Sequence, residues 1–563
     1  MTQPWAAWAA PWRSTLALVG LVTLARVIYV FWFCPYALIE DEAHYWEWSR
    51  RLEWSYYSKG PGIGWAIRLA TELFGGSEGA IRMVAVVSGG VLPLAVAWLA
   101  RTLFDDGRVG FFAACCTILA PVFLFTSILS TIDGPYSACW AVAAASAIIA
   151  LREGRPRLWA LCGLAIGVGF LFKYTILLLP LAFPLLWFRR NRLGSSARGH
   201  TLWIGLGVGV ASLGLLPVIV FNAQNDWVTV RHLLGHLGVA GGDTPSSGEP
   251  WTYSPLWTLE LIGTQLALVG FPLLLGVYGL FTARRAPQES GEGVRDRTAA
   301  VDCWLLSLPI LVFYLAVSFF TLPEGNWPIA GWITPMACAG YAVTRGMERF
   351  RAEVSAWKAM PKPRPRAGKV RRSPERHRQI AWHATLAVHI PIALVMLRLD
   401  LLAQVPGVGP LVPIGRLTSG RDIALDTEAL LEQLRTEDRA DSREPFVIAQ
   451  HYGRASLMAY YLPGQPTTYA SSAHTGGRKT QYDLWAETDL LDPGTDDHLS
   501  GRDAVCLGGT GDSWRRVFER VVKLDPLPGD HKGRDAFIGY GFRGFPSAIA
   551  EAVRGIDGAD NRP

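Results

Sequence analysis

The apolar segment TLALVGLVTLARVIYVFWF (residues 15–33) is soon followed by the polar segment IEDEAHYWEWSRRLEWSYYSKGPG (residues 39–62). The first has the length of a membrane-spanning helix, which needs about 20 apolar residues. It is too long for the core of a signal peptide, and no small-residue cleavage site follows it. We therefore interpret it as a retained first span, ending just before a loop that is crowded with acids, bases and aromatic residues.

The rest of the chain extends this pattern. Half of its 563 residues are apolar and only 18% are charged, whereas a soluble domain carries about a quarter of charged residues. Long apolar runs predict about eleven spans, at roughly 14–33, 79–100, 109–128, 134–151, 157–172, 174–188, 201–221, 258–282, 301–321, 327–345 and 380–403. The chain is therefore expected to be an α-helical polytopic membrane protein, with its multi-span domain over residues 1–405.

Lysine and arginine are concentrated in alternate loops. Nearly all of them lie in the loops at 101–108, 151–157, 189–200, 283–300 and 346–379, whereas the loops at 129–133, 222–257 and 322–326 carry a single Arg231. Cytoplasmic loops hold the excess of these residues, so we expect the N-terminus inside the cell and residues 39–62 outside. The last basic loop contains KPRPRAGKVRR. The first outer loop breaks the rule with Arg50, Arg51, Lys59 and Arg68, which favours a site there.

Two further elements are expected outside the membrane. GIGWAIRLATELFGG (62–76) places Ile63, Ile67, Ala70 and Phe74 at helical spacing, which fits either an interfacial helix or a helix that covers the bundle. From about residue 420 the composition becomes soluble, and FVIA, ASLMAYYL, PTTYA, AVCLGG and FERVVKLDPLP read as strand, helix and further strands. We expect a small extracytoplasmic α/β domain over 420–553, followed by a frayed tail.

The cysteines, the net charge and the position of the ionisable groups argue against several other classes of protein. The eight cysteines are scattered, mostly in apolar runs, and no CxxC pair is present, so small packed side chains are favoured over metal ligands or disulfides. The net charge of +6 fits basic loops facing anionic lipid better than nucleic-acid binding. Ionisable groups are rare at the centres of the spans, where a transporter would be expected to place some.

Instead, ionisable and aromatic residues gather at one membrane face. The first loop offers Asp41, Glu42, His44, Tyr57 and Lys59, and later segments on the same side, STIDGPY, FLFKYT and PEGNWP, add Asp133, Lys173, Glu324, Asn326 and Trp327. Carboxylates can deprotonate a hydroxyl, lysines can hold a phosphate, and aromatic rings can pack on sugars and lipids. On composition alone, interfacial anchors explain these groups better than a site does.

The sequence motifs around these residues favour a functional site over interfacial anchors. DEAHYWEWS, YYSKGPG, TIDGPY, FLFKYT and PEGNWP, with ASLMAYYLPGQP and QYDLW further on, resemble bacterial GT-C membrane glycosyltransferases. The similarity is to the family-39/83 group, which includes protein O-mannosyltransferases and the lipid A aminoarabinose transferases. It covers most of the chain and implies a GT-C fold, a polyprenyl-phosphate sugar donor, and an extracytoplasmic glycolipid, polysaccharide or protein as acceptor.

The resemblance also implies roles for the acids. Asp41 matches the catalytic first-loop aspartate, and Glu42 is expected either to orient it or to bind the acceptor. The alternative is that this pair only stabilises a helix end. Asp133 matches the second-loop aspartate and is expected to position substrate.

The resemblance assigns the remaining groups to substrate binding. Lys59 matches a lysine that contacts the lipid phosphate, although Ser58 replaces the usual acid or His, and Gly60 replaces a proline and loosens the loop. Lys173 is expected either to contact phosphate or to snorkel. His44, Tyr57, Glu324, Asn326 and Trp327 are expected to line the cavity, and no ligand-spaced set supports a metal at His44, so a divalent metal is left open.

The sequence thus predicts a glycosyltransferase of the bacterial cytoplasmic membrane that works on the outer face with inversion at the sugar. Its partners are a polyprenyl-phosphate sugar, membrane lipids and the acceptor. Two other classes stay open: a flippase or transporter of lipid-linked sugars, and a non-catalytic envelope assembly protein.

Overall fold

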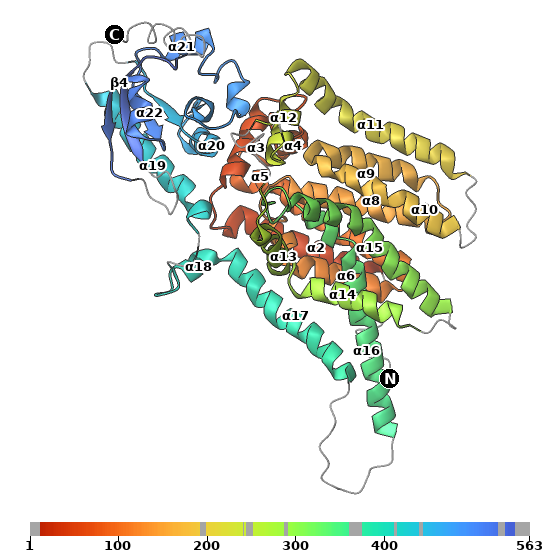
Figure 1. The fold of residues 1–563 in the computed structure, drawn as a ribbon. Coiled ribbons are helices and arrows are strands. Elements are labelled where there is room, and N and C mark those ends of the chain that lie inside the picture. The colour runs from red at the N-terminus through yellow and green to blue at the C-terminus, as the bar shows by residue number, and fades with distance from the viewer. Residues whose placement is uncertain are drawn as a thin grey trace.

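The computed structural model describes residues 12–191, 199–239, 241–243, 252–286, 291–359, 374–409, 412, 414–437, 443–526 and 535–546. The predicted KPRPRAGKVRR segment and the predicted frayed tail lie outside the described residues, as does the end of the domain expected to run to residue 553. The described chain forms a helical bundle with a sheet-containing C-terminal region beside it (Figure 1).

The bundle elements follow one another in chain order. They are α2 (Trp12–Ile28), η1 (Tyr29–Phe33), α3 (Glu40–Arg50), α4 (Gly62–Phe74), α5 (Glu78–Phe104), α6 (Gly107–Leu119), α7 (Pro121–Phe125), α8 (Asp133–Glu153), α9 (Leu158–Phe172), η2 (Tyr174–Ala182), α10 (Phe183–Asn191), α11 (His200–Gln224), α12 (Val228–His236), α13 (Pro255–Val269), α14 (Phe271–Arg284), α15 (Gly291–Val317), η3 (Ile329–Trp332), α16 (Pro335–Ala359), α17 (Pro374–Leu397) and α18 (Leu399–Ala403).

The C-terminal region adds a second set of elements. They are α19 (Gly415–Thr436), β1 (Phe446–Ala449), α20 (Tyr452–Tyr461), β2 (Tyr469–Ala470), η5 (Ser472–His474), η6 (Gln481–Asp483), α21 (Pro493–Leu499), β3 (Ala504–Leu507), α22 (Gly511–Arg515), β4 (Phe518–Lys523) and β5 (Ala536–Phe542).

Several helices have the length and apolarity of membrane spans. Within the described residues five qualify, namely Trp12–Phe33, Glu78–Phe104, Asp133–Glu153, His200–Gln224 and Gly291–Val317, and the bent pair α13–α14 brings the count to as many as six. Shorter apolar helices occupy Gly107–Leu119, Leu158–Phe172, Tyr174–Arg189 and Trp382–Leu397. A polytopic helical protein is therefore confirmed, while the number of eleven spans stays a prediction.

Several of the expected spans are interrupted, and two of them show the cause. The span expected at 258–282 bends by 97° between α13 and α14. Gly270 stands at the bend with φ +69°, and a Cβ there would lie 2.2 Å from the His389 ring, so only glycine fits without displacing that ring. The span expected at 109–128 stops at Ala120, and Pro121 starts the short α7, because proline cannot donate the hydrogen bond that would continue α6.

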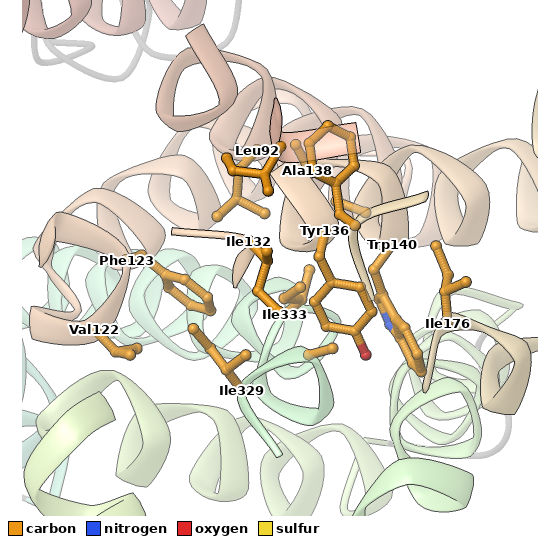
Figure 2. Packing of buried hydrophobic residues seen from close by; sticks show 14 of the residues in the cluster. Leu92, Val122, Phe123, Ile132, Tyr136, Ala138, Trp140, Ile176, Ile329 and Ile333 are labelled. Carbon is orange, nitrogen blue, oxygen red and sulfur yellow. The ribbon is translucent and has the colours of Figure 1, made fainter. Parts of the chain in front are cut away.

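A dense core holds the start of α8 in place. Tyr136 and Trp140 of α8 are fully buried and lie beside Ile132, Ile176 and Ile329 in one cluster (Figure 2). Large aromatic side chains supply much of the apolar area that such a core buries. The N-terminal end of α8, which carries Asp133, is thereby fixed against η2 and η3.

The C-terminal sheet has the strand order β2-β1-β3-β5-β4. The strands β2, β1 and β3 run parallel, and β5 is antiparallel to both β3 and β4. Parallel strands need a crossover, which α20 supplies between β1 and β2. The expected strands at FVIA, PTTYA, AVCLGG and FERVVK and the expected helix at ASLMAYYL are all present.

The sheet region is not packed as a separate body. One hydrophobic cluster runs from the bundle through Tyr45 and Trp48 of α3 to Met458 of α20 and Val505 of β3. Helix α20 packs directly on α3, and the two lie close together where the two parts meet (Figure 1). The division at residues 405–420 stays a prediction, and the contact places C-terminal residues next to the loop at 39–62.

Candidate active site

Helix α3 carries the two acids that the sequence placed at the centre of the site. It begins at Glu40, so Asp41 and Glu42 both lie in its first turn. The side chains of successive residues in an α-helix point about 100° apart, so neighbouring side chains face different surroundings. The fully buried Glu42 faces the bundle, whereas the partly exposed Asp41 faces a cavity.

Glu42 is sealed into the protein. Its carboxylate accepts hydrogen bonds from Arg82 Nη2 at 2.9 Å and Nε at 3.1 Å, and from the backbone N–H of Ser130 at 2.8 Å and of Ile39 at 3.2 Å. Both Glu42 and Arg82 are 0% exposed. The expectation that Glu42 binds the acceptor is not met, because no lone pair of its carboxylate reaches the cavity. It anchors the start of α3 instead.

The cavity beside α3 has a volume of about 640 Å³. Every residue predicted for the site except Glu42 lines it, namely Asp41, His44, Tyr57, Lys59, Asp133, Lys173, Glu324, Asn326 and Trp327. These residues come from segments far apart in the chain, all of which were predicted to lie at the same membrane face. Among the described residues the Asp41 carboxylate has no hydrogen-bond or ion-pair partner, which leaves it available to a ligand.

Lys59 projects into the cavity from the loop between α3 and α4. Its ammonium group donates to Tyr45 OH at 2.7 Å, and burial lowers its pKa while the charge of Asp41 opposes that shift. The expectation of a loosened loop stays a prediction, and the structure gives Gly60 another role. A Cβ on Gly60 would lie 2.4 Å from the carbonyl oxygen of Leu171, so glycine lets the loop backbone lie against the end of α9.

That close approach brings Lys59 to the neighbourhood of Lys173. The Lys173 ammonium lies 2.8 Å from Asp133 Oδ1, and Asn326 Nδ2 donates to Asp133 Oδ2 at 2.6 Å. Asp133 therefore ties α8 to the end of α9 and to the segment before η3. Lys173 points into the cavity rather than away from it, which favours its phosphate-contact role over snorkelling.

The remaining predicted residues form the walls. His44 uses both ring nitrogens within the protein, with Nδ1 3.0 Å from Ser456 Oγ and Nε2 accepting from Trp48 Nε1 at 3.2 Å. Burial lowers its pKa well below the ordinary value, so the ring is neutral and poorly placed to hold a metal. Arg50 and Arg51, whose charges were expected to favour a site, pair with Glu47.

Sequence reasoning missed a second network on the cavity wall. Tyr57 OH donates to Asp243 Oδ2, which lies 2.9 Å from His232 Nδ1, and His232 Nε2 lies 3.0 Å from His236 Nε2. Burial lowers the pKa of His232 to about 4. The two histidines are four residues apart on α12, a spacing that was visible in the sequence.

The C-terminal region supplies residues that were also missed. Tyr452, Arg478, Thr480 and Gln481 line the same cavity, and Gln481 Oε1 accepts from the Tyr57 backbone N–H at 2.7 Å. Their loop is held over the cavity because α20 packs on α3. No spacing rule connects these residues with Asp41, since more than 400 positions separate them in the chain.

The arrangement combines three chemical capacities. An unpaired carboxylate can accept a proton, a buried lysine with a neutral partner can stabilise a phosphate, and aromatic and leucine side chains can receive apolar groups. Within the described ranges no group of three or more His, Cys, Asp or Glu side chains is arranged to hold a metal ion.

The chain is similar to proteins described as glycosyltransferases. The family model of dolichyl-phosphate-mannose-protein mannosyltransferases matches residues 58–221. Lipid A galacturonosyltransferase RgtD of Rhizobium johnstonii is 27% identical over 331 residues, covering 57% of this chain and 63% of that protein. The undecaprenyl phosphate-alpha-4-amino-4-deoxy-L-arabinose arabinosyl transferase of Pseudomonas paraeruginosa is 31% identical over 312 residues, covering 52% of this chain and 51% of that protein.

The matched segments thus span between half and two thirds of these relatives. Among solved structures, the crystal structure of ArnT from Cupriavidus metallidurans bound to undecaprenyl phosphate superposes with a TM-score of 0.58 at 16% identity, covering 96% of this chain and 99% of that one. The chain therefore has the ArnT fold, and the resemblance to GT-C membrane glycosyltransferases is confirmed.

Proposed function

We propose that this membrane protein with the GT-C fold transfers a sugar from a polyprenyl-phosphate donor to a lipid acceptor on the outer side of the cytoplasmic membrane. One observation carries the proposal: the unpaired Asp41 carboxylate and the buried Lys59 ammonium share a cavity with apolar walls. The names of the relatives, which include a lipid A galacturonosyltransferase and undecaprenyl-phosphate arabinosyl transferases, point the same way.

The donor phosphate is assigned to Lys59, with Lys173 beside it. Among the described residues the Lys59 ammonium hydrogen-bonds to the phenol of Tyr45 and to no acid, so no direct contact there neutralises its charge. A phosphate oxygen would supply a charge-assisted hydrogen bond there. As the bond between phosphate oxygen and anomeric carbon breaks, negative charge grows on the leaving phosphate, and a cation fixed in a buried site stabilises it most.

Asp41 is assigned as the general base. The acceptor hydroxyl gives its proton to the Asp41 carboxylate while its oxygen forms the new bond to the anomeric carbon. Polyprenyl phosphate departs from the opposite face, so the configuration at that carbon inverts. Asp133 acts on the other side of the substrate by holding Lys173 and Asn326.

The prenyl tail is assigned to a groove next to the cavity. This groove, of about 470 Å³, lies between α4, α5, α8 and α9, and Phe172 lines both it and the cavity. Its walls are almost wholly apolar, with Leu69, Leu73 and Val87 among them. A lipid tail there would keep the phosphate at Lys59 and the isoprene units against hydrocarbon. The acceptor is a lipid A-type glycolipid, and the donor sugar is either a uronic acid or an aminopentose, as the relatives' names suggest.

The test uses purified full-length protein in lipid nanodiscs with lipid A present. Polyprenyl phosphates carrying a uronic acid, an aminopentose or a neutral hexose are offered, and release of polyprenyl phosphate is measured for the wild type, Asp41→Asn and Glu72→Gln. Glu72 is an exposed acid of α4 that pairs with Arg68 outside the cavity and serves as the matched control.

We expect release by the wild type and Glu72→Gln with one donor, and a loss of about a hundredfold or more for Asp41→Asn. Equal release by Asp41→Asn would remove this residue from the mechanism. No release with any donor, in lipid A and in envelope extract alike, would refute the transferase and favour transport of lipid-linked sugars or an assembly role.

A further inference from the structure

The segment between η5 and η6 brings an arginine from the C-terminal region over the cavity. Arg478 lines the cavity together with Tyr452, and its guanidinium carbon lies 5.8 Å from the centre of the Tyr452 ring. Gly476, with φ +88°, turns the chain just before it, a backbone conformation that side chains other than glycine rarely adopt. The geometry therefore presents a planar cation on an aromatic face to the substrate space.

Arg478 has no bound acid of its own. Among the described residues, no side chain makes a hydrogen bond or ion pair with its guanidinium. Two nearby acids have other partners: Asp243 Oδ2 accepts from Tyr57 and lies 2.9 Å from His232, and Asp483 accepts from the Thr480 N–H and lies 3.4 Å from His474. Asp41 lines the same cavity but makes no hydrogen bond or ion pair with Arg478 among the described residues. A guanidinium without a carboxylate partner in a cavity is a ready site for an oxyanion.

The charge of Arg478 reaches several walls of the cavity. It lowers the pKa of Lys59, His232 and His236, although burial is the larger cause for each of them. Its influence on Lys59 is smaller than that of Lys173. Lys59 and Lys173 belong to the bundle, and Lys173 pairs with Asp133. Arg478 belongs to the C-terminal region and lies beside Tyr452, so cations reach the cavity from two separate parts of the chain.

We propose that Arg478 binds a second oxyanion of the substrates, distinct from the donor phosphate held at Lys59. The inference rests on the proposed function, because it assumes that Lys59 takes the phosphate of a polyprenyl donor. Two sources share the required chemistry: the carboxylate of a uronic acid on the donor, and a phosphate on the lipid acceptor. Arginine suits both, since its fork of N–H groups matches a planar carboxylate or two phosphate oxygens.

The test measures equilibrium binding, so that it does not depend on turnover. Full-length wild type, Arg478→Gln, Arg478→Lys and Lys479→Gln are placed in nanodiscs. Lys479 is the exposed cation that follows Arg478 in the same segment, and its replacement is the matched control. The radiolabelled probes are undecaprenyl phosphate, a polyprenyl-phospho-uronate, the matching neutral polyprenyl-phospho-hexose, and lipid A with and without its phosphates.

We expect Arg478→Gln to weaken binding of either the uronate donor or phosphorylated lipid A by about 10- to 100-fold. The undecaprenyl phosphate, neutral-hexose and dephosphorylated probes should change by less than about threefold, as should every probe with Lys479→Gln. The probe that is affected identifies the source. Arg478→Lys should restore phosphate binding better than carboxylate binding, because lysine lacks the planar fork.

Three results would overturn the inference. In the first, Arg478→Gln weakens the binding of undecaprenyl phosphate and of all its derivatives equally, which would place Arg478 at the donor phosphate. In the other two, the variant leaves the binding of every probe unchanged, or the wild type binds no probe. Arg478-dependent binding without release of polyprenyl phosphate from any donor would refute the proposed function and leave the oxyanion site standing.

Discussion

Asp41 and Glu42 are neighbours in the chain and lie in opposite surroundings. Glu42 is fully buried and accepts four hydrogen bonds, two of them from Arg82, whereas Asp41 lines the cavity and accepts none from the described residues. A buried charge is tolerated only when it is paired and hydrogen-bonded. The difference teaches that saturation marks an acid that maintains the fold, while an unsatisfied acid facing a cavity is available for chemistry.

The largest effect should come from the saturated acid. Glu42→Gln removes the nearer carboxylate of the buried Arg82 and leaves it only Glu78, 3.7 Å away, which should destabilise the protein by about 3 kcal/mol. Thermal unfolding in detergent measures this. The control is Glu72→Gln, which breaks the exposed Arg68–Glu72 pair and should cost about 0–1 kcal/mol. Equal melting temperatures for the two variants would contradict the distinction between the acids.

The unsatisfied acid should show the reverse behaviour. Asp41→Asn should lower turnover about a hundredfold or more and leave the melting temperature near that of the wild type, because no hydrogen bond within the described residues depends on its charge. Turnover and thermal unfolding are measured on the same preparation. A large loss of stability in Asp41→Asn would show that this side chain has a structural partner after all.

Asp133 lies between these two extremes, since it is paired and also lines the cavity. Asp133→Asn frees Lys173 and removes a negative charge near the phosphate position, so binding of undecaprenyl phosphate should strengthen by roughly threefold. Turnover should nevertheless fall by about tenfold, because Lys173 and Asn326 lose their fixed orientation. Asn326→Ala, which changes no charge, should lower turnover without strengthening binding. Weaker binding by Asp133→Asn would contradict this assignment.

The smallest effect concerns the histidine network. Burial holds the pKa of His232 at about 4 in the folded protein, below its ordinary value of about 6.5, so the unfolded chain binds more protons between these values. Stability should therefore be complete above pH 6.5 and decline as the pH falls toward 4. His232→Gln should reduce the slope of stability against pH by about one proton or less, with His44 and His236 keeping part of it. An unchanged slope would contradict the burial of a neutral ring.

Many residues of the candidate site could be predicted because they lie in short sequence motifs. Asp41, Lys59, Asp133, Lys173 and Asn326 all lie in segments between expected spans that were predicted to be on one side of the membrane, and this shared side predicted that they come together. Their roles stay predictions, but the structure brings them to one cavity. Four of the five strands of the C-terminal region, β1 to β4, were also predicted, since alternation and turn residues are local signals, whereas β5 (Ala536–Phe542) was missed.

The rest depended on contacts that no local pattern encodes. The fate of Glu42 is decided by Arg82, 40 residues away along the chain, and the role of Gly60 by the backbone of Leu171. Arg478 lines the cavity in a segment that long-range contacts join to the bundle, among them the hydrogen bond between the Tyr57 N–H and Gln481. Helical periodicity predicts that neighbouring side chains point in different directions, but it does not predict which residues from other segments they contact.

The shared core between α3 and α20 has a consequence for building hybrid enzymes. The Leu38 backbone N–H donates to Tyr461 OH at 2.7 Å, and His44 Nδ1 lies 3.0 Å from Ser456 Oγ, so helix α3 and the loop before it pack closely against the C-terminal region. A chimaera that takes only the C-terminal region from a relative would pack α3 against a surface with different side chains. Chimaeras intended to change substrate choice should therefore carry residues 36–62 and the C-terminal region from the same parent.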